Sequence, residues 1–197
     1  MNIIERVKNM LLTPKTEWEV VNTEIARPDS LFIGYVLPLS ILSAVGPILS
    51  GILFGSIFGI TYFLITAVIA FLSSIIGFYI SLYIIDMLAP SFDSEKNLGK
   101  SAQLIAYSAT PSYVAGFLSF IPIVGGLLKF VAWIYSIYIM YLGLGPLKKT
   151  SEDKKVIYLV VAFIVMIGIT IIVAAILGGI LFAAFGLGAV SLRGMHP

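Results

Sequence analysis

The chain has 197 residues, of which 59% are hydrophobic and only 11% are charged. Its mean hydropathy is +1.06. Typical soluble domains have about 25% charged residues, so this composition argues against a soluble protein. The net charge of +2 is too small to suggest a nucleic-acid partner, and the absence of cysteine excludes disulfides and thiol chemistry.

Residues 1–30 form a mixed-charge arm with two predicted helices. Apolar residues recur at helical spacing in the first helix, opposite a charged face: Ile3, Ile4, Val7, Met10 and Leu11. Such a helix can lie in the lipid headgroup layer, or it can pack on the rest of the protein as a cytoplasmic arm. Thr13 and Pro14 predict the start of a second helix, with Trp18, Val21 and Ile25 on one face. Both placements of the arm remain open.

Five long apolar segments follow, so residues 31–192 are predicted to form a transmembrane domain. A helix needs about 20 apolar residues to cross a bilayer. Residues 30–85 contain no charge at all, which is enough for two crossings. The predicted fold class is therefore an all-α polytopic membrane bundle of five transmembrane helices: Leu31–Phe54, Ile60–Leu88, Ser101–Ile121, Gly126–Gly145 and Val156–Val190.

Three features predict irregular spans. Pro38 and Pro47 predict bends in the first span. Pro111 predicts a kink in the third, because it leaves the carbonyl of Tyr107 without its helical donor. The fifth span lies in a stretch of 37 uncharged residues. At 1.5 Å per residue it is roughly 55 Å long, so it either extends past the bilayer or breaks at residues 186–188.

Small residues spaced four apart predict close helix packing. The first row is Gly51, Gly55 and Gly59, in which we expect Gly51 to pack against a neighbouring helix and Gly59 to form the turn between spans one and two. The second row, in the fifth span, is predicted to contact another helix or subunit. The predicted helix-packing residues are Gly51, Gly55, Ala175, Gly179 and Ala183.

Basic residues are sorted by the predicted spans. Ten of the twelve fall on one side: Arg6, Lys8, Lys15, Arg27, Lys96, Lys100, Lys148, Lys149, Lys154 and Lys155. Only Arg193 falls on the other side, and Lys129 lies just inside a span. Because cytoplasmic loops carry the excess of Lys and Arg, we expect the N-terminus in the cytoplasm and residues 193–197 outside.

The sequence contains few residues that could form an enzyme active site. Its only histidine is His196, at a terminus of the kind that is usually poorly ordered. A metal cluster with standard ligand spacing, a Ser-His-Asp set and a phosphate-binding loop are all missing from the sequence. We therefore expect no catalytic, metal or cofactor-binding residues and no enzyme activity.

Asp86 is the informative ionisable residue, because charges within spans are costly and usually face a bundle interior or water. Polar residues on spans two to four share helical faces with similar spacing. One hypothesis is a polar groove open to the cytoplasm, in which a tyrosine or Gln103 donates to Asp86. The alternative is that Asp86 lies in the headgroup zone and the tyrosines form an interfacial belt. The groove candidates are Asp86, Tyr79, Tyr83, Gln103, Tyr107, Thr110, Tyr138 and Tyr141.

Four segments, in their order and spacing, resemble a prokaryotic member of the YIP (Ypt-interacting protein) family: Leu11–Trp18, Ala106–Pro111, Ile121–Gly125 and Gly145–Glu152. The resemblance covers nearly the whole chain and implies a five-span helical protein with a cytoplasmic N-terminus. Eukaryotic members act in vesicle traffic and bind Rab-type GTPases. Their Asp-Leu-Tyr-Gly-Pro motif is not present in this sequence, which argues against a GTPase partner.

The sequence thus favours a non-enzymatic membrane protein that organises the bilayer or recruits partners. The alternative is a small transporter, channel or lipid-translocating protein that uses the polar groove. The expected location is the prokaryotic cytoplasmic membrane. The expected partners are the lipid bilayer and a second copy or another membrane protein.

Overall fold

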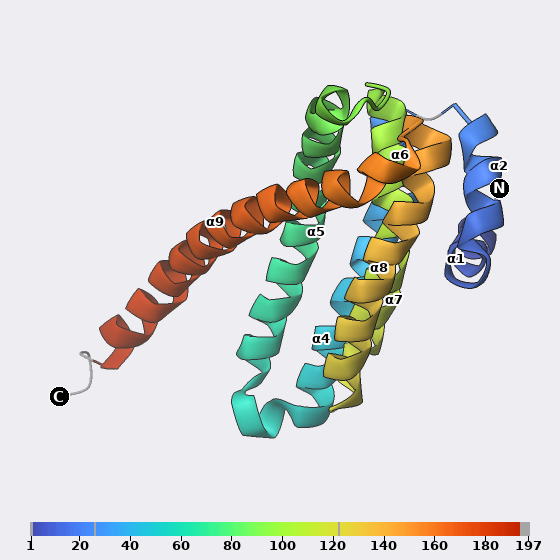
Figure 1. The fold of residues 1–197 in the computed structure, drawn as a ribbon. Coiled ribbons are helices and arrows are strands. Elements are labelled where there is room, and N and C mark those ends of the chain that lie inside the picture. The colour runs from blue at the N-terminus through green and yellow to red at the C-terminus, as the bar shows by residue number, and fades with distance from the viewer. Residues whose placement is uncertain (1, 26, 122, 194–197) are drawn as a thin grey trace.

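The computed structural model describes residues 2–25, 27–121 and 123–193, which form helices and no strand (Figure 1). In chain order the elements are α1 (Ile3–Leu12), α2 (Pro14–Thr23), α3 (Pro28–Leu31), the π-helix η1 (Phe32–Val36), α4 (Leu37–Phe58), α5 (Ile60–Leu88), the 3-10 helix η2 (Ala89–Phe92), α6 (Leu98–Ser108), α7 (Thr110–Phe117), the 3-10 helix η3 (Leu118–Phe120), α8 (Val124–Lys148) and α9 (Glu152–Arg193).

In the described part of the chain, four helical stretches are long and apolar enough to cross a membrane: Pro28–Phe54, Ile60–Phe92, Val124–Lys148 and Glu152–Val173. They correspond to the first, second, fourth and fifth predicted spans. The predicted third span is divided between α6, with 11 residues, and α7, with 8 residues. Each is shorter than the roughly 20 residues that a continuous crossing helix needs.

The kink predicted at Pro111 is present as a break between α6 and α7. Ala109 separates the two helices, and Pro111 lies in the first turn of α7, where a missing backbone N–H costs nothing. The hydroxyl of Thr110 donates to the carbonyl of Tyr107 over 2.6 Å. A local side chain therefore satisfies the carbonyl that the proline leaves free.

The two prolines of the first span behave differently. Pro38 has no N–H to donate to the carbonyl four residues earlier. The turn before it is a π-helix, in which the N–H of Leu37 reaches the carbonyl of Phe32. Pro47 lies inside α4 without ending it. The first span therefore begins with a wider, π-helical turn just before Pro38. Such turns are often found at functional sites.

α4 and α5 form an antiparallel hairpin around Gly59, which has φ +76° (Figure 1). This is a region that glycine adopts without strain. Gly51 faces α5, where an added Cβ would lie 2.8 Å from the Cβ of Phe63. The side-chain position of Gly55 lies outside what the structure describes.

α9 is continuous from Glu152 to Arg193, so the break considered at residues 186–188 is absent. The helix leaves the bundle at an angle (Figure 1). Ala175 and Gly179 are exposed, and a Cβ added to Gly179 would meet nothing within 4 Å. The surroundings of Ala183 lie outside the described residues. The contact expected from this row stays a prediction about a second subunit or partner helix.

The buried core lies at one end of the bundle, around α6. Every residue from Ser101 to Ser108 is buried. Around them pack side chains from the arm, α5, α8 and α9, including Trp18, Leu82, Leu144 and Tyr158. From Ser101 to its end, α6 is thus enclosed by protein, although charged and polar side chains are among its neighbours.

The basic segments meet at this same end. The N–H of Glu95, between η2 and α6, donates to the carbonyl of Lys148 at the end of α8 over 2.7 Å. The ammonium of Lys149 lies 2.7 Å from the carboxylate of Glu95 and lowers the pKa of that carboxyl. The ammonium of Lys100 donates to the carbonyl of Asn22 in the arm over 2.7 Å. Three segments that the sequence assigned to one side are therefore neighbours.

Candidate functional site at the interface of the arm and the bundle

The N-terminal arm, α1 and α2, packs on the bundle beside α8 and the two short helices α6 and α7 (Figure 1). Trp18 is fully buried, and its indole N–H donates to the carbonyl of Ile139 over 2.9 Å. The hydroxyl of Tyr135 donates to the carbonyl of Leu11 over 2.8 Å. The structure therefore packs the arm on the bundle, and the position of the arm relative to the lipid headgroups stays a prediction. Ile25, expected beside Trp18, is fully exposed because α2 ends before it.

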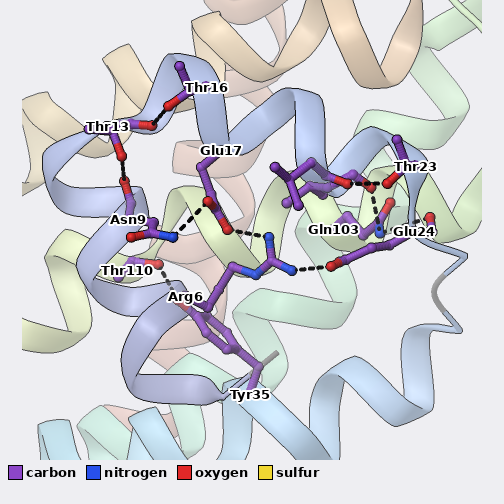
Figure 2. A network of polar contacts seen from close by, with 12 residues as sticks. Arg6, Asn9, Thr13, Thr16, Glu17, Thr23, Glu24, Tyr35, Gln103 and Thr110 are labelled. Atoms are coloured by element: carbon purple, nitrogen blue, oxygen red, sulfur yellow. Dashed lines mark hydrogen bonds and ion pairs between the residues drawn. The ribbon is translucent and has the colours of Figure 1, made fainter.

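Arg6 is the centre of a buried charge network in the arm (Figure 2). One guanidinium nitrogen donates to Glu17 over 2.6 Å, and the other pairs with Glu24. The amide of Asn9 also donates to Glu17, over 3.0 Å. The side chains of Arg6 and Glu17 are both only 5% exposed. A charge this deeply buried is tolerated only with counter-charges, so the network holds α1 against α2.

α6 supplies donors to the carboxyl end of α2. The amide of Gln103 donates to the carbonyls of Val21 and Glu24, each over 3.3 Å. Lys100 donates to the carbonyls of Asn22 and Glu24 over 2.7 and 3.2 Å. The last carbonyls of a helix have no partner within it and carry partial negative charge. Gln103 and Lys100 therefore fix the end of the arm to the bundle.

A second set of contacts joins the first span to the α6–α7 break. The hydroxyl of Tyr35, in η1, lies 2.7 Å from that of Thr110. The ring of Tyr35 meets the ring of Tyr107 edge-on, with 4.8 Å between the centroids. The guanidinium carbon of Arg6 lies 4.9 Å from the same Tyr107 ring. Tyr107 thus contacts both the arm and the entry of the first span.

A cavity of about 490 Å³, called here the arm pocket, opens between the arm and the start of the first span. Its polar lining comes from Arg6, Glu24, Ser30, Tyr35 and Tyr107, and its remaining lining from Ile3, Ile25, Leu31 and Gly34. Arg6 and the two tyrosines are buried, whereas Ile25 is fully exposed. The pocket therefore combines a charged inner wall with an apolar rim.

Asp86 forms a separate buried cluster at the ends of α5, α6 and α8. It is 5% exposed and accepts hydrogen bonds from Ser101 over 3.0 Å and from Lys148 over 3.2 Å. Lys148 is fully buried and also donates to Ser101 over 2.7 Å. The hypothesis named a tyrosine or Gln103 as the donor to Asp86. Instead, Gln103 binds the arm, and the partner of Asp86 is a lysine.

The remaining groove candidates lie in other environments. Tyr83 and Tyr138 are 52% and 51% exposed, and Tyr79 and Tyr141 are half-buried. The hydroxyl of Tyr141 donates to Glu152 over 3.3 Å. The structure therefore brings Gln103, Tyr107 and Thr110 together near the arm, and places Asp86 and the other tyrosines elsewhere.

Sequence reasoning did not single out Arg6, Glu17, Glu24 or Lys148 as site residues. Arg6 lies four residues before Met10, so it shares the face of α1 that is buried. A cation on an otherwise apolar helical face was therefore a usable signal. The described residues contain no group of three or more His, Cys, Asp or Glu that could hold a metal ion, and His196 lies outside them.

Apolar helices able to cross a membrane, packed into one helical bundle, define an integral multi-pass membrane protein. Residues 8–175 match the Yip1 domain, and because this match spans most of the chain, the protein belongs to the Yip1 family. No curated protein and no solved structure matches the chain.

Proposed function

We propose that the chain is a non-enzymatic membrane protein that organises the bilayer or recruits a partner, with its docked arm as the contact element. The observation that carries this proposal is the arrangement of the polar residues. Asp86 and Tyr107 are 5% and 7% exposed and are packed among partners in different clusters, whereas Tyr83 is 52% exposed. A passage for ions or lipid headgroups would need polar side chains on one shared, water-accessible surface.

The arm is suited to contact because its two faces differ. Its inner face carries Trp18 and the Arg6 network, while Glu5, Lys8, Lys15 and Glu19 are exposed on its surface. The mixed charge of this surface, close to the exposed apolar side chains Ile4 and Leu12, is compatible with both lipid headgroups and a protein partner.

The same proposal includes five crossings with the N-terminus in the cytoplasm. Asp86, near the end of α5, pairs with Lys148, at the end of α8, so these two helices finish at the same end of the bundle. α8 begins 24 residues earlier, about 36 Å away along the helix. The segment from α6 to η3 must therefore run the length of the bundle, which supports its role as a broken third span.

The orientation follows from the charges. The end that carries Lys100, Lys148 and the arm holds most of the basic residues, and we assign it to the cytoplasm. Lys129 is exposed 19 residues before Lys148, about 28 Å along α8, and we assign it to the outer headgroup layer of a prokaryotic cytoplasmic membrane.

Reconstitution in liposomes tests the proposed role. We expect neither ion flux nor lipid translocation above that of protein-free liposomes, and no change with Asp86→Ala. Wild-type flux that disappears in Asp86→Ala would instead favour the transporter or lipid-translocating alternative. Because Asp86→Ala leaves Lys148 buried without its counter-charge, the double variant Asp86→Asn, Lys148→Met is the matched control for folding.

A further inference from the structure

We propose that the arm pocket binds the primary ammonium headgroup of a membrane phospholipid of the phosphatidylethanolamine class. This goes beyond the proposed function, since such a site would exist whether the protein recruits a partner, organises the bilayer or moves a solute. The argument rests on where the pocket opens, on its charge, and on its free space.

The pocket opens where a lipid headgroup would be. Leu31, Gly34 and Tyr35 line it from the first turns of the candidate span Pro28–Phe54. The entry of a span is the level at which a bilayer presents its headgroups. Ile25, which lines the pocket, is fully exposed, and Ile33, next to Gly34 in the chain, is 64% exposed, so apolar side chains are available to an acyl chain near the pocket. A ligand with a polar head and an acyl chain matches this arrangement.

The charge of the pocket favours a cation over an anion. The guanidinium of Arg6 already donates to two carboxylates, those of Glu17 and Glu24. The carboxylate of Glu24 lines the pocket and its side chain is 35% exposed, so it remains accessible. The negative charge of this carboxylate would repel an incoming phosphate, whereas an ammonium group could donate N–H hydrogen bonds to it and balance its charge.

The nearby lysine does not reverse this balance. Lys100 contacts the backbone carbonyl of Glu24 and that of Asn22, on the side of α2 that faces α6. Counting Lys100 and Arg6 against the two carboxylates leaves the region neutral rather than positive. Tyr35 adds an aromatic wall, which attracts cations. A neutral, zwitterionic lipid with an ammonium group fits this environment better than an anionic lipid.

Free space in the pocket allows a direct test. The cavity of about 490 Å³ is many times the roughly 30 Å³ that one water molecule occupies in the liquid. Gly34 lines it, and a Cβ built on Gly34 would meet nothing within 4 Å. Gly34→Leu should therefore fill the pocket without disturbing the helix packing. Gly77 in α5 also has nothing within 4 Å and lies against a different cavity, so Gly77→Leu is the matched control.

The experiment measures lipid retention by the purified full chain with native mass spectrometry, and the thermal unfolding midpoint with each added lipid. The lipids share acyl chains and differ in headgroup: phosphatidylethanolamine, phosphatidylcholine, whose methylated ammonium has no N–H donor, and anionic phosphatidylglycerol. Hydrogen bonds to charged groups contribute about 1.5–3 kcal/mol, so we expect phosphatidylethanolamine to be preferred by about tenfold or more.

Gly34→Leu and Glu24→Gln should abolish the preference, and Gly77→Leu should keep it. Equal retention of the three lipids, or an unchanged preference in Gly34→Leu, would overturn the proposal. Glu24→Gln retains the size of the side chain. If Gly34→Leu does not fold, an unchanged lipid preference in Glu24→Gln would overturn the proposal. The last measurement replaces the lipid by soluble phosphoethanolamine. If it binds as tightly as the lipid, the ligand is a soluble amine and the lipid assignment is wrong.

Discussion

The guanidinium carbon of Arg6, in the first helix of the arm, lies 4.9 Å from the ring centroid of Tyr107, in the last turn of α6. The carbonyl of Tyr107 accepts a hydrogen bond from the hydroxyl of Thr110. The same hydroxyl contacts that of Tyr35 at the start of the first span. The arm is thus connected through three residues to the break in α6–α7 and to the π-helical turn. Release of the arm would expose these contacts together.

Replacing Arg6 should detach the arm. In Arg6→Gln, the carboxylates of Glu17 and Glu24 lose the cation that neutralises them. Removing one partner of a buried ion pair typically costs about 3–5 kcal/mol. We expect the thermal unfolding midpoint to fall and limited proteolysis to cut within residues 1–30. Lys8→Gln, on the exposed face of the same helix, should change neither measurement.

Trp18 should report that the arm is packed on protein rather than lying in lipid. The chain has two tryptophans: Trp18 is fully buried and Trp133 is 46% exposed. In liposomes that contain brominated lipids, we expect the fluorescence of Trp133, measured in Trp18→Phe, to be quenched strongly. The fluorescence of Trp18, measured in Trp133→Phe, should be quenched little. Strong quenching of Trp18 would show that this face of the arm contacts lipid instead of the bundle.

Asp86 and Lys148 should show a large coupling in a double-mutant cycle. Asp86→Asn leaves the fully buried Lys148 without its counter-charge. Lys148→Met in turn leaves the buried carboxylate of Asp86 without its counter-charge. Each single change should destabilise the protein by about 3–5 kcal/mol, whereas the double change should cost much less than the sum. Thermal unfolding in detergent measures all four proteins. Additive effects would contradict the direct pairing.

Among the glycines whose surroundings the structure describes, Gly46 should be the least tolerant of alanine. A Cβ on Gly46 would clash with the backbone carbonyls of Gly116 and Phe117, because α4 and α7 approach closely there. Overpacking of this kind costs about 1–3 kcal/mol. We expect Gly46→Ala to lower the unfolding midpoint. Gly77→Ala, where a Cβ meets nothing within 4 Å, should leave it unchanged or slightly raised.

The absence of cysteine makes the topology directly testable. Lys15→Cys places a thiol on the exposed arm, and Ile123→Cys places one at a position that is 93% exposed at the opposite end, before α8. In intact cells, a membrane-impermeant maleimide should label Ile123→Cys alone. Labelling of Lys15→Cys should require permeabilised cells. Labelling of both without permeabilisation would contradict five crossings with a cytoplasmic N-terminus.

The sequence alone determined the class of protein and much of its helical layout. Long apolar segments have to cross a bilayer or be buried, and a proline has to break a helical hydrogen bond, wherever the rest of the chain lies. For this reason the four long helices, the turn at Gly59 and the break near Pro111 could be predicted. These features depend on the chemistry of neighbouring residues and on their interaction with lipid.

The tertiary structure decided which polar residues meet. Asp86 and Lys148 are 62 residues apart, and no local pattern links them. Gln103 and Tyr107 were predicted to face a groove, but the arm covers them, because its helices bury Trp18 and Arg6 against α6 and α8. The partner of a polar side chain depends on which helices pack side by side, and that depends on the fit of many distant side chains at once.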